Sequence, residues 1–338
     1  MYKRQVPVVT TVMGRGAIPT THPLYIGNLG MHGAYACNMA VNECDLLFSI
    51  GTRFNDRITG KLHSFAPNAQ IVHIDIDTAA ISKNVQVDVP IVADAKEAVS
   101  KMLEYVSECE TKKWLATIKE WKEEHPLMMK KKPIMTPQDV IETINRIFDE
   151  AIIVTDVGQH QMFTAQFIEI TEKKKLLMSG GLGTMGYGLG AAIGAKMGRP
   201  DKTVVNIAGD GCFRMNMNEL ATAARCGRQL IQIVMNNHVL GMVRQWQTLF
   251  YDHRYSHTVL DDAVDFVKIS EGMGAKAFRV TKMEEVEPAI RKALAMDEPV
   301  VLDCWIDQDL SVFPMVPAGA SLNEVFDEED MKNNEQSV

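Results

Sequence analysis

The chain has 338 residues, of which 46% are hydrophobic and 23% are charged, and its formal net charge is -8 at pH 7. Because surfaces that bind nucleic acids are basic, this acidic balance argues against a nucleic-acid partner. No apolar run approaches the roughly 20 residues that a membrane-spanning helix needs. The length exceeds what one hydrophobic core usually supports, so we expect two domains.

The cysteines and the amino-terminal stretch favour a cytoplasmic protein. The six cysteines are scattered along the chain, without a C-x-x-C motif. This distribution favours reduced thiols over a disulfide framework. The apolar stretch at 6–12 contains threonines and a proline, and no cleavage site follows it. A secretory signal is therefore not expected.

The first part of the chain has the pattern of an α/β domain. Short apolar runs rich in β-branched residues lie at 6–11, 45–50 and 70–75, and longer segments separate them. Such runs predict buried parallel strands joined by crossover helices. An amphipathic helix is expected at 94–106.

The stretch 109–136 differs in composition, with many lysines and glutamates. Trp114 and Trp121 lie seven residues apart, which places them on one face of a helix. The lysine run at 130–132 is interpreted as a solvated turn. We expect this stretch to be a helical linker that packs on a neighbouring domain.

The second part repeats the α/β pattern. A helix is expected to begin at Thr136, with Thr136 as the cap and Pro137 at the first helical position. Strands are expected at 151–155, 176–179, 203–208, 230–235 and 300–306. The predicted fold is α/β, with two three-layer parallel-sheet domains at 1–108 and 137–310, a linker at 109–136 and a carboxyl-terminal tail at 311–338.

The most informative segment runs from 204 to 242. One apolar run ends in Gly-Asp-Gly with Asp210 at its centre, and the next ends in Asn236-Asn237. Neighbouring parallel strands would bring Asp210 and Asn237 to the same edge of the sheet. Carboxylate and amide oxygens suit Mg²⁺, and Gly211 would let the backbone approach a phosphate. Each motif alone is typical of a turn, but their combination predicts a metal and phosphate site.

This pair of motifs resembles the signature of the thiamin-diphosphate enzymes. By that resemblance, Asp210, Asn237 and the backbone carbonyl of Val239 bind Mg²⁺, which holds the diphosphate of the cofactor. The segments 155–160 and 179–188 resemble two further cofactor-binding stretches of the family. The contacts implied are Gly158, Gln159, His160, Gly183, Met185, Asp210, Gly211, Cys212, Asn237, Val239, Leu240, Gly241 and Met242.

Two segments narrow the resemblance to acetolactate synthases, namely GMVRQWQ at 241–247 and FYDHRYS at 250–256. In that family the tryptophan matching Trp246 selects the larger second 2-oxo acid, and Met185 supports the bent cofactor. Arg57 is implied to bind the carboxylate of the incoming 2-oxo acid through its bidentate fork. With Met242, these are the expected catalytic residues. The activity implied is decarboxylation of pyruvate and transfer of the two-carbon unit to pyruvate or 2-oxobutyrate, in branched-chain amino-acid biosynthesis.

The first domain is similar to the central, FAD-binding domain of the same enzymes. Its segments 29–33 and 51–58 carry the similarity, whereas a G-x-G-x-x-G motif is missing. The flavin contacts implied are Gly30, His32, Gly51, Arg53, Asp75, Ile76 and Asp94. Asn55 replaces an aspartate that is usual in the family and is not included.

The resemblance also implies partners. The family assembles as dimers or tetramers of catalytic subunits and has a separate small regulatory subunit. The glutamate that activates the cofactor lies in an amino-terminal domain that would precede Met1. We therefore expect this chain alone to bind cofactor weakly, to turn over little and to expose apolar surface in its first domain.

Three other functions stay open at this point. The first is another thiamin-diphosphate enzyme, such as a pyruvate oxidase, a 2-oxo acid decarboxylase or a glyoxylate carboligase. The second is a remnant without activity that serves binding or assembly. The third is a nicotinamide-dependent dehydrogenase. The phosphate-binding glycine motif that would support this function is missing from the sequence.

Overall fold

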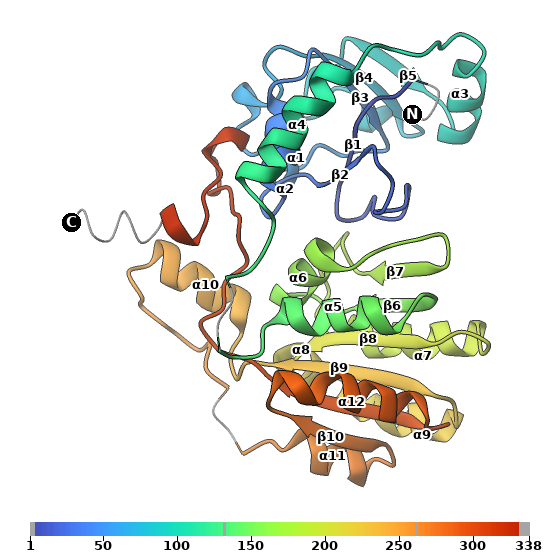
Figure 1. Ribbon diagram of the computed structural model, residues 1–338, viewed down its shortest axis with the longest axis vertical. Coiled ribbons are helices and arrows are strands. Elements are labelled where there is room, and N and C mark those ends of the chain that lie inside the picture. The colour runs from blue at the N-terminus through green and yellow to red at the C-terminus, as the bar shows by residue number, and fades with distance from the viewer. Residues whose placement is uncertain (1–3, 131–132, 261–262, 331–338) are drawn as a thin grey trace. The chain divides into compact units, whose positions relative to one another are not determined.

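The computed structural model describes residues 4–130, 133–260 and 263–330 (Figure 1). These residues form two compact units. Unit 1 contains residues 4–14, 22–127 and 313–330, and unit 2 contains residues 15–21 together with the described part of 128–312. Residues 131–132 of the expected lysine turn and 331–338 of the expected tail lie outside the described residues.

Unit 2 is built on one six-stranded sheet with the order β10-β11-β9-β8-β6-β7 (Figure 1). Every neighbouring pair in this sheet is parallel. The carboxyl ends of all six strands therefore lie at one edge, where α/β sheets bind ligands. The strands are β6 (Ala151–Thr155), β7 (Lys174–Met178), β8 (Val204–Gly209), β9 (Leu230–Asn236), β10 (Lys276–Val280) and β11 (Pro299–Trp305).

Alternate residues of the central strands point into two different cores. In β9, Ile231 and Ile233 belong to one buried cluster, whereas Leu230 and Val234 belong to the other. The first cluster includes residues of α5, α6 and α12, and the second includes residues of α7, α8, α9 and α11. Helices thus cover both faces of the sheet, which is why its central strands carry apolar residues on both faces.

The helices of unit 2 are α5 (Pro137–Ile147), α6 (Gln159–Phe167), α7 (Tyr187–Gly198), α8 (Asp210–Asn216), α9 (Leu220–Cys226), α10 (Gly241–Phe250), α11 (Phe266–Gly272) and α12 (Met283–Leu294). The predicted start of α5 is confirmed. The Thr136 hydroxyl accepts a hydrogen bond from the backbone N–H of Asp139, and the Asp139 carboxylate accepts one from the Thr136 backbone. Pro137 occupies the first helical position.

Unit 1 contains two smaller sheets, both parallel. One has the strands β1 (Val8–Thr10) and β2 (Tyr25–Asn28), and the other has β3 (Leu46–Ile50), β4 (Gln70–Asp75) and β5 (Val89–Val92). The helices α1 (Tyr35–Asn42), α2 (Asp56–Thr59) and α3 (Ala95–Met102) follow β2, β3 and β5. The core of this unit combines residues of both sheets with Val41 of α1 and Ile58 of α2.

Helix α4 (Lys112–Glu124) packs on α1 within unit 1. The rings of Trp114 and Trp121 meet edge to face with centroids 5.5 Å apart, and Ile118 is buried. The Lys122 ammonium donates a hydrogen bond of 3.3 Å to the Tyr25 carbonyl. The amino-terminal part of the expected linker 109–136 therefore belongs to unit 1, up to residue 127.

The segment after residue 312 returns to unit 1. The Val316 backbone N–H donates to the Met31 carbonyl at 2.8 Å, and the Lys61 backbone N–H donates to the Ala320 carbonyl at 2.9 Å. Leu322 is buried in the core of the unit. In the described residues, this part of the expected tail 311–338 is thus an integral part of unit 1.

Three strands were not expected from the sequence, namely β2, β5 and β10. Strand β5 contains Pro90, which weakens a strand prediction. In β10, the exposed Lys276 lies in an edge strand of only five residues, so the apolar pattern is short. No helix in the described part of the chain is long and apolar enough to span a membrane.

Candidate cofactor and metal site

Asp210 and Asn237 lie at the carboxyl ends of two paired strands. Gly209 at the end of β8 pairs with Met235 near the end of β9. Asp210 begins α8 directly after β8, and Asn237 follows β9 directly. Both side chains are buried, so the sheet places a carboxylate and an amide together below the surface.

Asp210 has the properties of an incomplete ligand site. Its Oδ2 atom is buried without a hydrogen-bond partner. Burial raises the pKa of this carboxyl to about 7, although hydrogen bonds from the backbone of Gly211 and of His238 act in the opposite direction. A buried carboxylate that lacks a partner is costly, and a divalent cation would supply one. The donor set therefore fits Mg²⁺.

The turn after β9 is held in a defined shape. His238 has a φ of 57°, in the left-handed region, and the Asn237 Oδ1 atom accepts a hydrogen bond of 3.2 Å from the Val239 backbone. The Leu240 backbone N–H donates to the Thr258 carbonyl at 2.7 Å. These contacts fix the positions of the Asn237 amide and the Val239 carbonyl.

Gly241 brings the turn next to α6. A Cβ atom at this position would collide with the Gln159 Oε1 atom and would lie 2.7 Å from the Asn237 Nδ2 atom. A larger residue would displace the Gln159 side chain, so the small size of glycine lets Gln159 approach Asn237. The structure thus places Gln159 and Asn237 together at the start of α10.

His160 lies next to the end of β8. Its ring packs against Gly209 and Gly158, which leave room for it. Burial lowers the pKa of His160 to about 4, so the imidazole is neutral at pH 7. Its buried Nε2 atom has no hydrogen-bond partner. The ring also bonds to the Asp156 backbone. This bond uses the one N–H of the neutral imidazole, so the Nε2 atom is an acceptor.

Met185 and Leu240 converge on Gly211. A Cβ atom on Gly211 would lie 2.6 Å from the Leu240 Cδ2 atom and 3.8 Å from the Met185 Cε atom. Gly183, in the same loop as Met185, has a φ of 65°, which glycine adopts without strain. The neighbouring Leu182 is 95% exposed, an unusual position for leucine.

Cys212 is a structural residue in this arrangement. Its thiol donates a hydrogen bond of 2.9 Å to the Val157 carbonyl. Burial raises the pKa of the Cys212 thiol well above its usual value. The thiol therefore stays protonated and joins α8 to the turn after β6.

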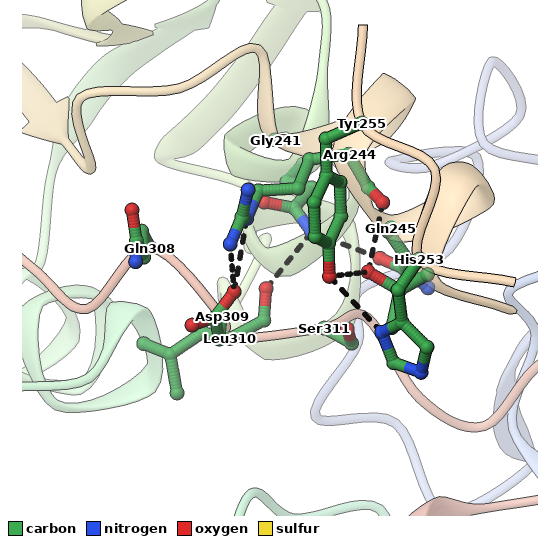
Figure 2. A pocket seen from close by; sticks show the side chains of 11 residues that line it. Gly241, Arg244, Gln245, His253, Tyr255, Gln308, Asp309, Leu310 and Ser311 are labelled. Atoms are coloured by element: carbon green, nitrogen blue, oxygen red, sulfur yellow. Dashed lines mark hydrogen bonds and ion pairs between the residues drawn. The ribbon is translucent and has the colours of Figure 1, made fainter. Parts of the chain in front are cut away.

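Helix α10 carries Met242 and Trp246. Met242 packs against the first core cluster, and the half-buried Trp246 meets the Phe250 ring edge to face at 5.3 Å. The helix also lines a cavity of about 280 Å³ with Gln159 and residues 308–311 (Figure 2). The Arg244 side chain donates a hydrogen bond of 2.9 Å to Asp309, and its guanidinium lies 4.0 Å from the centre of the Tyr255 ring. Figure 2 shows these three residues at the cavity.

Asp156 is a site residue that the sequence reasoning missed. Its Oδ1 atom accepts a hydrogen bond from the Gly186 backbone at 2.8 Å, and its Oδ2 atom accepts one from the Gly188 backbone at 3.0 Å. Asp156 thus ties the turn before Gly158 to the loop that contains Met185. Its position, directly after a buried strand and two residues before a glycine, could have identified Asp156 as a site residue from the sequence.

Gln245 and Asp303 were missed as well. The Gln245 Oε1 atom accepts hydrogen bonds of 2.9 Å from the Gln159 side chain and from the Val312 backbone. The buried Asp303 accepts one of 2.8 Å from the Asn236 amide, next to Asn237. Both act through contacts between distant segments, so no sequence pattern indicated them.

The residues expected to contact flavin lie in unit 1, at the carboxyl ends of its strands. Gly30 comes after β2, Gly51 after β3, and Ile76 after β4. A Cβ atom on Gly30 would collide with the Arg57 carbonyl, so Gly30 and Arg57 are neighbours. Gly51 and Ile76 are exposed.

The other expected residues of unit 1 have identified contacts. Asp94, after β5, caps α3 by accepting hydrogen bonds from the Lys96 and Glu97 backbones. Asp75 accepts one from the backbone of Asp77, and the carbonyl of the exposed Arg53 accepts one from the Asn84 side chain.

Arg57 and His32 complete the set in unit 1. The Arg57 side chain is 58% exposed and pairs with Asp56 at 2.8 Å. His32 is half-buried in the loop that follows β2. Arg57 lies in unit 1, whereas Met185, Met242 and Trp246 lie in unit 2.

Two family models match the chain. Residues 2–102 match the model described as "Thiamine pyrophosphate enzyme, central domain". Residues 156–304 match the model described as "Thiamine pyrophosphate enzyme, C-terminal TPP binding domain". The second match contains Asp210, Asn237, Gln159 and His160, and the first contains Arg57.

Curated relatives cover nearly the whole chain. The chain is 48% identical over 333 residues to "Acetolactate synthase large subunit" of Corynebacterium glutamicum. This match spans 95% of the chain and 53% of the relative. The chain is 42% identical over 331 residues to the protein of the same name from Cyanidium caldarium, and 44% identical over 332 residues to "Probable acetolactate synthase large subunit" of Methanocaldococcus jannaschii. Each of these two matches spans 95% of the chain and 56% of the relative.

The chain therefore spans about half the length of the curated relatives that it matches. Both matched models describe thiamine pyrophosphate enzymes, and they occupy the two units in the order central, then C-terminal. Together with the buried residues at the ends of β8 and β9, these matches establish that the chain belongs to the thiamine pyrophosphate enzyme family, in the branch of the acetolactate synthase large subunits.

Proposed function

We propose that the chain provides the cofactor-binding part of an acetolactate synthase. The reaction is decarboxylation of pyruvate and transfer of the two-carbon unit to a second pyruvate or to 2-oxobutyrate. The observation that carries the proposal is the buried, unpartnered Asp210 Oδ2 atom beside Asn237, in a chain 48% identical to an acetolactate synthase large subunit.

In this proposal, Asp210, the Asn237 amide oxygen and the Val239 carbonyl hold Mg²⁺. Their fit rests on the short turn that fixes Asn237 and Val239 and on the missing partner of Asp210. His160, whose ring packs against Gly209 at the end of β8, is proposed as a further contact of the cofactor. The remaining cofactor contacts proposed are Gly158, Gln159, Gly183, Gly211, Cys212, Leu240, Gly241 and Met242. When bound, thiamin diphosphate supplies the nucleophilic carbon and the electron sink for decarboxylation.

The substrate side is assigned to four residues. Met185 supports the cofactor, and its position beside Gly211 favours this role. Trp246 selects the second 2-oxo acid from α10, with Met242 one turn before it on the same helix. Arg57 binds the substrate carboxylate, because its guanidinium is 58% exposed and its ion pair with Asp56 uses one of the five N–H donors.

FAD is assigned to unit 1 on the positions of the expected contacts. Gly51, Ile76 and Asp94 follow the three paired parallel strands β3, β4 and β5, at the kind of edge where dinucleotides bind in doubly wound sheets, and Gly30 follows β2 of the other parallel sheet. His32 and Arg53 lie in the loops after β2 and β3, and Asp75 is the last residue of β4. Asp94 would reach the ligand with the oxygen that does not cap α3.

The partners proposed are a second catalytic subunit, in a dimer or tetramer, and a small regulatory subunit. The relatives' names describe a large subunit, which implies a smaller one in those proteins. None of the six cysteines, all in described residues, forms a disulfide. Their scattered spacing supports a cytoplasmic location.

The test is an assay of acetolactate formation from pyruvate with thiamin diphosphate, Mg²⁺ and FAD. It uses this chain with and without a separately expressed amino-terminal domain of the Corynebacterium glutamicum relative. Acetolactate formed only with that domain would support the proposal. Acetaldehyde or acetyl phosphate as the product would instead assign a decarboxylase or an oxidase. Mg²⁺-dependent cofactor binding without any product would favour a remnant without activity.

A further inference from the structure

Gln245 is a buried polar residue of α10 that bonds to a distant backbone segment. It is 2% exposed, although glutamine usually lies at the surface. Its Oε1 atom accepts a hydrogen bond of 2.9 Å from the Val312 backbone N–H, and its Nε2 atom donates one of 3.1 Å to the Val312 carbonyl. The donor and the acceptor of one backbone residue thus bond to the two ends of the same amide.

This pairing fixes the orientation of the Gln245 amide. A backbone N–H can only donate a hydrogen bond, and a backbone carbonyl can only accept one. Turning the amide by 180° would place its NH₂ group against the Val312 N–H and its oxygen against the Val312 carbonyl. The Oε1 atom therefore stays on the side of the Val312 N–H, where it can accept a second hydrogen bond.

Gln245 in turn helps to fix the orientation of Gln159, the first residue of α6. The Gln159 Nε2 atom donates hydrogen bonds of 2.9 Å to the Gln245 Oε1 atom and of 2.9 Å to the Leu310 carbonyl. Both partners are acceptors, so the nitrogen of the Gln159 amide faces them. Its oxygen consequently points to the other side, toward Gly241.

The Gln159 oxygen meets the nitrogen side of the Asn237 amide at Gly241. A Cβ atom on Gly241 would collide with the Gln159 Oε1 atom and would lie 2.7 Å from the Asn237 Nδ2 atom. The Asn237 Oδ1 atom faces the turn instead, where it accepts a hydrogen bond of 3.2 Å from the Val239 backbone. The orientation of the Asn237 amide thus agrees with that of Gln159.

We infer that Gln245 is a positioning residue that fixes the Gln159 amide and, through it, the Asn237 amide at the proposed metal site. Mg²⁺ takes oxygen ligands, so an Asn237 amide turned the other way would present an NH₂ group, which is not a ligand for it. Gln245 acts through Gln159 rather than by binding the cofactor itself. The inference rests on the proposed function, because Gln159 and Asn237 hold cofactor and metal only in that proposal.

The test is isothermal titration of the full chain with thiamin diphosphate in excess Mg²⁺. Gln245→Met keeps the length of the side chain but removes its donor and its acceptor. The cofactor should bind about tenfold more weakly to this variant, at the lower end of the range for outer-shell partners, because the Leu310 carbonyl still holds Gln159.

A second variant separates positioning from packing. Gln245→Glu keeps an oxygen that accepts from Gln159 and from the Val312 N–H, but it removes the donor to the Val312 carbonyl. Both variants should therefore lose stability in denaturant unfolding. Gln245→Glu should nevertheless bind the cofactor nearly as tightly as the unchanged chain. Without cofactor, hydrogen exchange of the Val312 amide should be faster in Gln245→Met and unchanged in Gln245→Glu.

The matched control is Gln229→Met, at the start of β9. Gln229 is half-buried, and its side chain donates a hydrogen bond of 2.7 Å to the Leu294 carbonyl, at the opposite edge of the sheet. This variant should lose stability and keep its cofactor affinity.

Three results would overturn the inference. The first is an unchanged cofactor affinity in Gln245→Met, and the second is an equal loss of affinity in Gln245→Met and Gln245→Glu. In both cases Gln245 would serve packing alone. The third is a lack of Mg²⁺-dependent cofactor binding in the unchanged chain. That result differs from the other two because it counts against the proposed function, and the inference would fall with it.

Discussion

The two parallel sheets that carry β3 and β9 differ in how they are covered. Strand β9 is fully buried, with helices on both faces and paired strands on both edges. Strand β3 is similarly apolar, yet three of its five residues are exposed, and one of its edges has no partner among the described residues. The apolar composition of a strand therefore indicates that it is suited to the interior of a sheet. Whether the strand is buried depends on the helices and strands that pack against it.

The largest difference is expected in the free energy of unfolding. Ile233→Ala in β9 removes a fully buried side chain and should cost about 2–5 kcal/mol. Phe48→Ala in β3 should change stability by less than about 0.5 kcal/mol, since Phe48 is exposed. Denaturant unfolding measures both. Equal losses at the two positions would mean that β3 is covered in solution.

The second prediction concerns Mg²⁺ binding at the carboxyl ends of β8 and β9 in unit 2. Asp210→Ala should weaken Mg²⁺ binding by at least about 100-fold, because it removes the only carboxylate of the proposed site. Isothermal titration with Mg²⁺ and thiamin diphosphate measures this. The control is Asp201→Ala, an exposed residue that precedes β8 at the opposite edge of the sheet. Unchanged Mg²⁺ affinity in Asp210→Ala would place the metal elsewhere.

A smaller effect on Mg²⁺ binding is expected from Asp303, which supports the turn after β9. Asp303→Ala removes the acceptor of the Asn236 amide and should weaken Mg²⁺ binding by roughly 10-fold. Asp307→Ala, outside this network, provides the control. If Asp303→Ala lowers stability but leaves Mg²⁺ affinity unchanged, Asp303 has no positioning role.

The smallest effect concerns the pH dependence of unit 1. Burial lowers the pKa of His73, in β4, below its ordinary value of 6.5, although Asp75 acts in the opposite direction. The unfolded chain therefore takes up the proton first, and unit 1 should lose stability as the pH falls below about 6.5. His73→Leu should flatten this slope in thermal unfolding measured between pH 7.5 and 5. A slope that persists in His73→Leu would assign it to another group.

Much of the ligand site could be predicted because it depends on short segments. Asp210 and Asn237 each follow an apolar run directly, and parallel pairing then brings the two positions together. Gln245 and Asp303 could not be predicted in this way. Their partners, Val312 and Asn236, lie 67 residues away in each case, and nothing local identifies such pairs.

The sequence by itself determined the α/β class, the start of α5 and the positions of the two motifs, because periodicity, capping and strand-end chemistry are local properties. Only the tertiary structure decided which helices cover each face, that residues 313–330 belong to unit 1, and that β3 has an open edge. The physical reason is that burial depends on segments far apart in the chain. Residues 46–50 would have the same apolar pattern whether or not a further strand lay beside them.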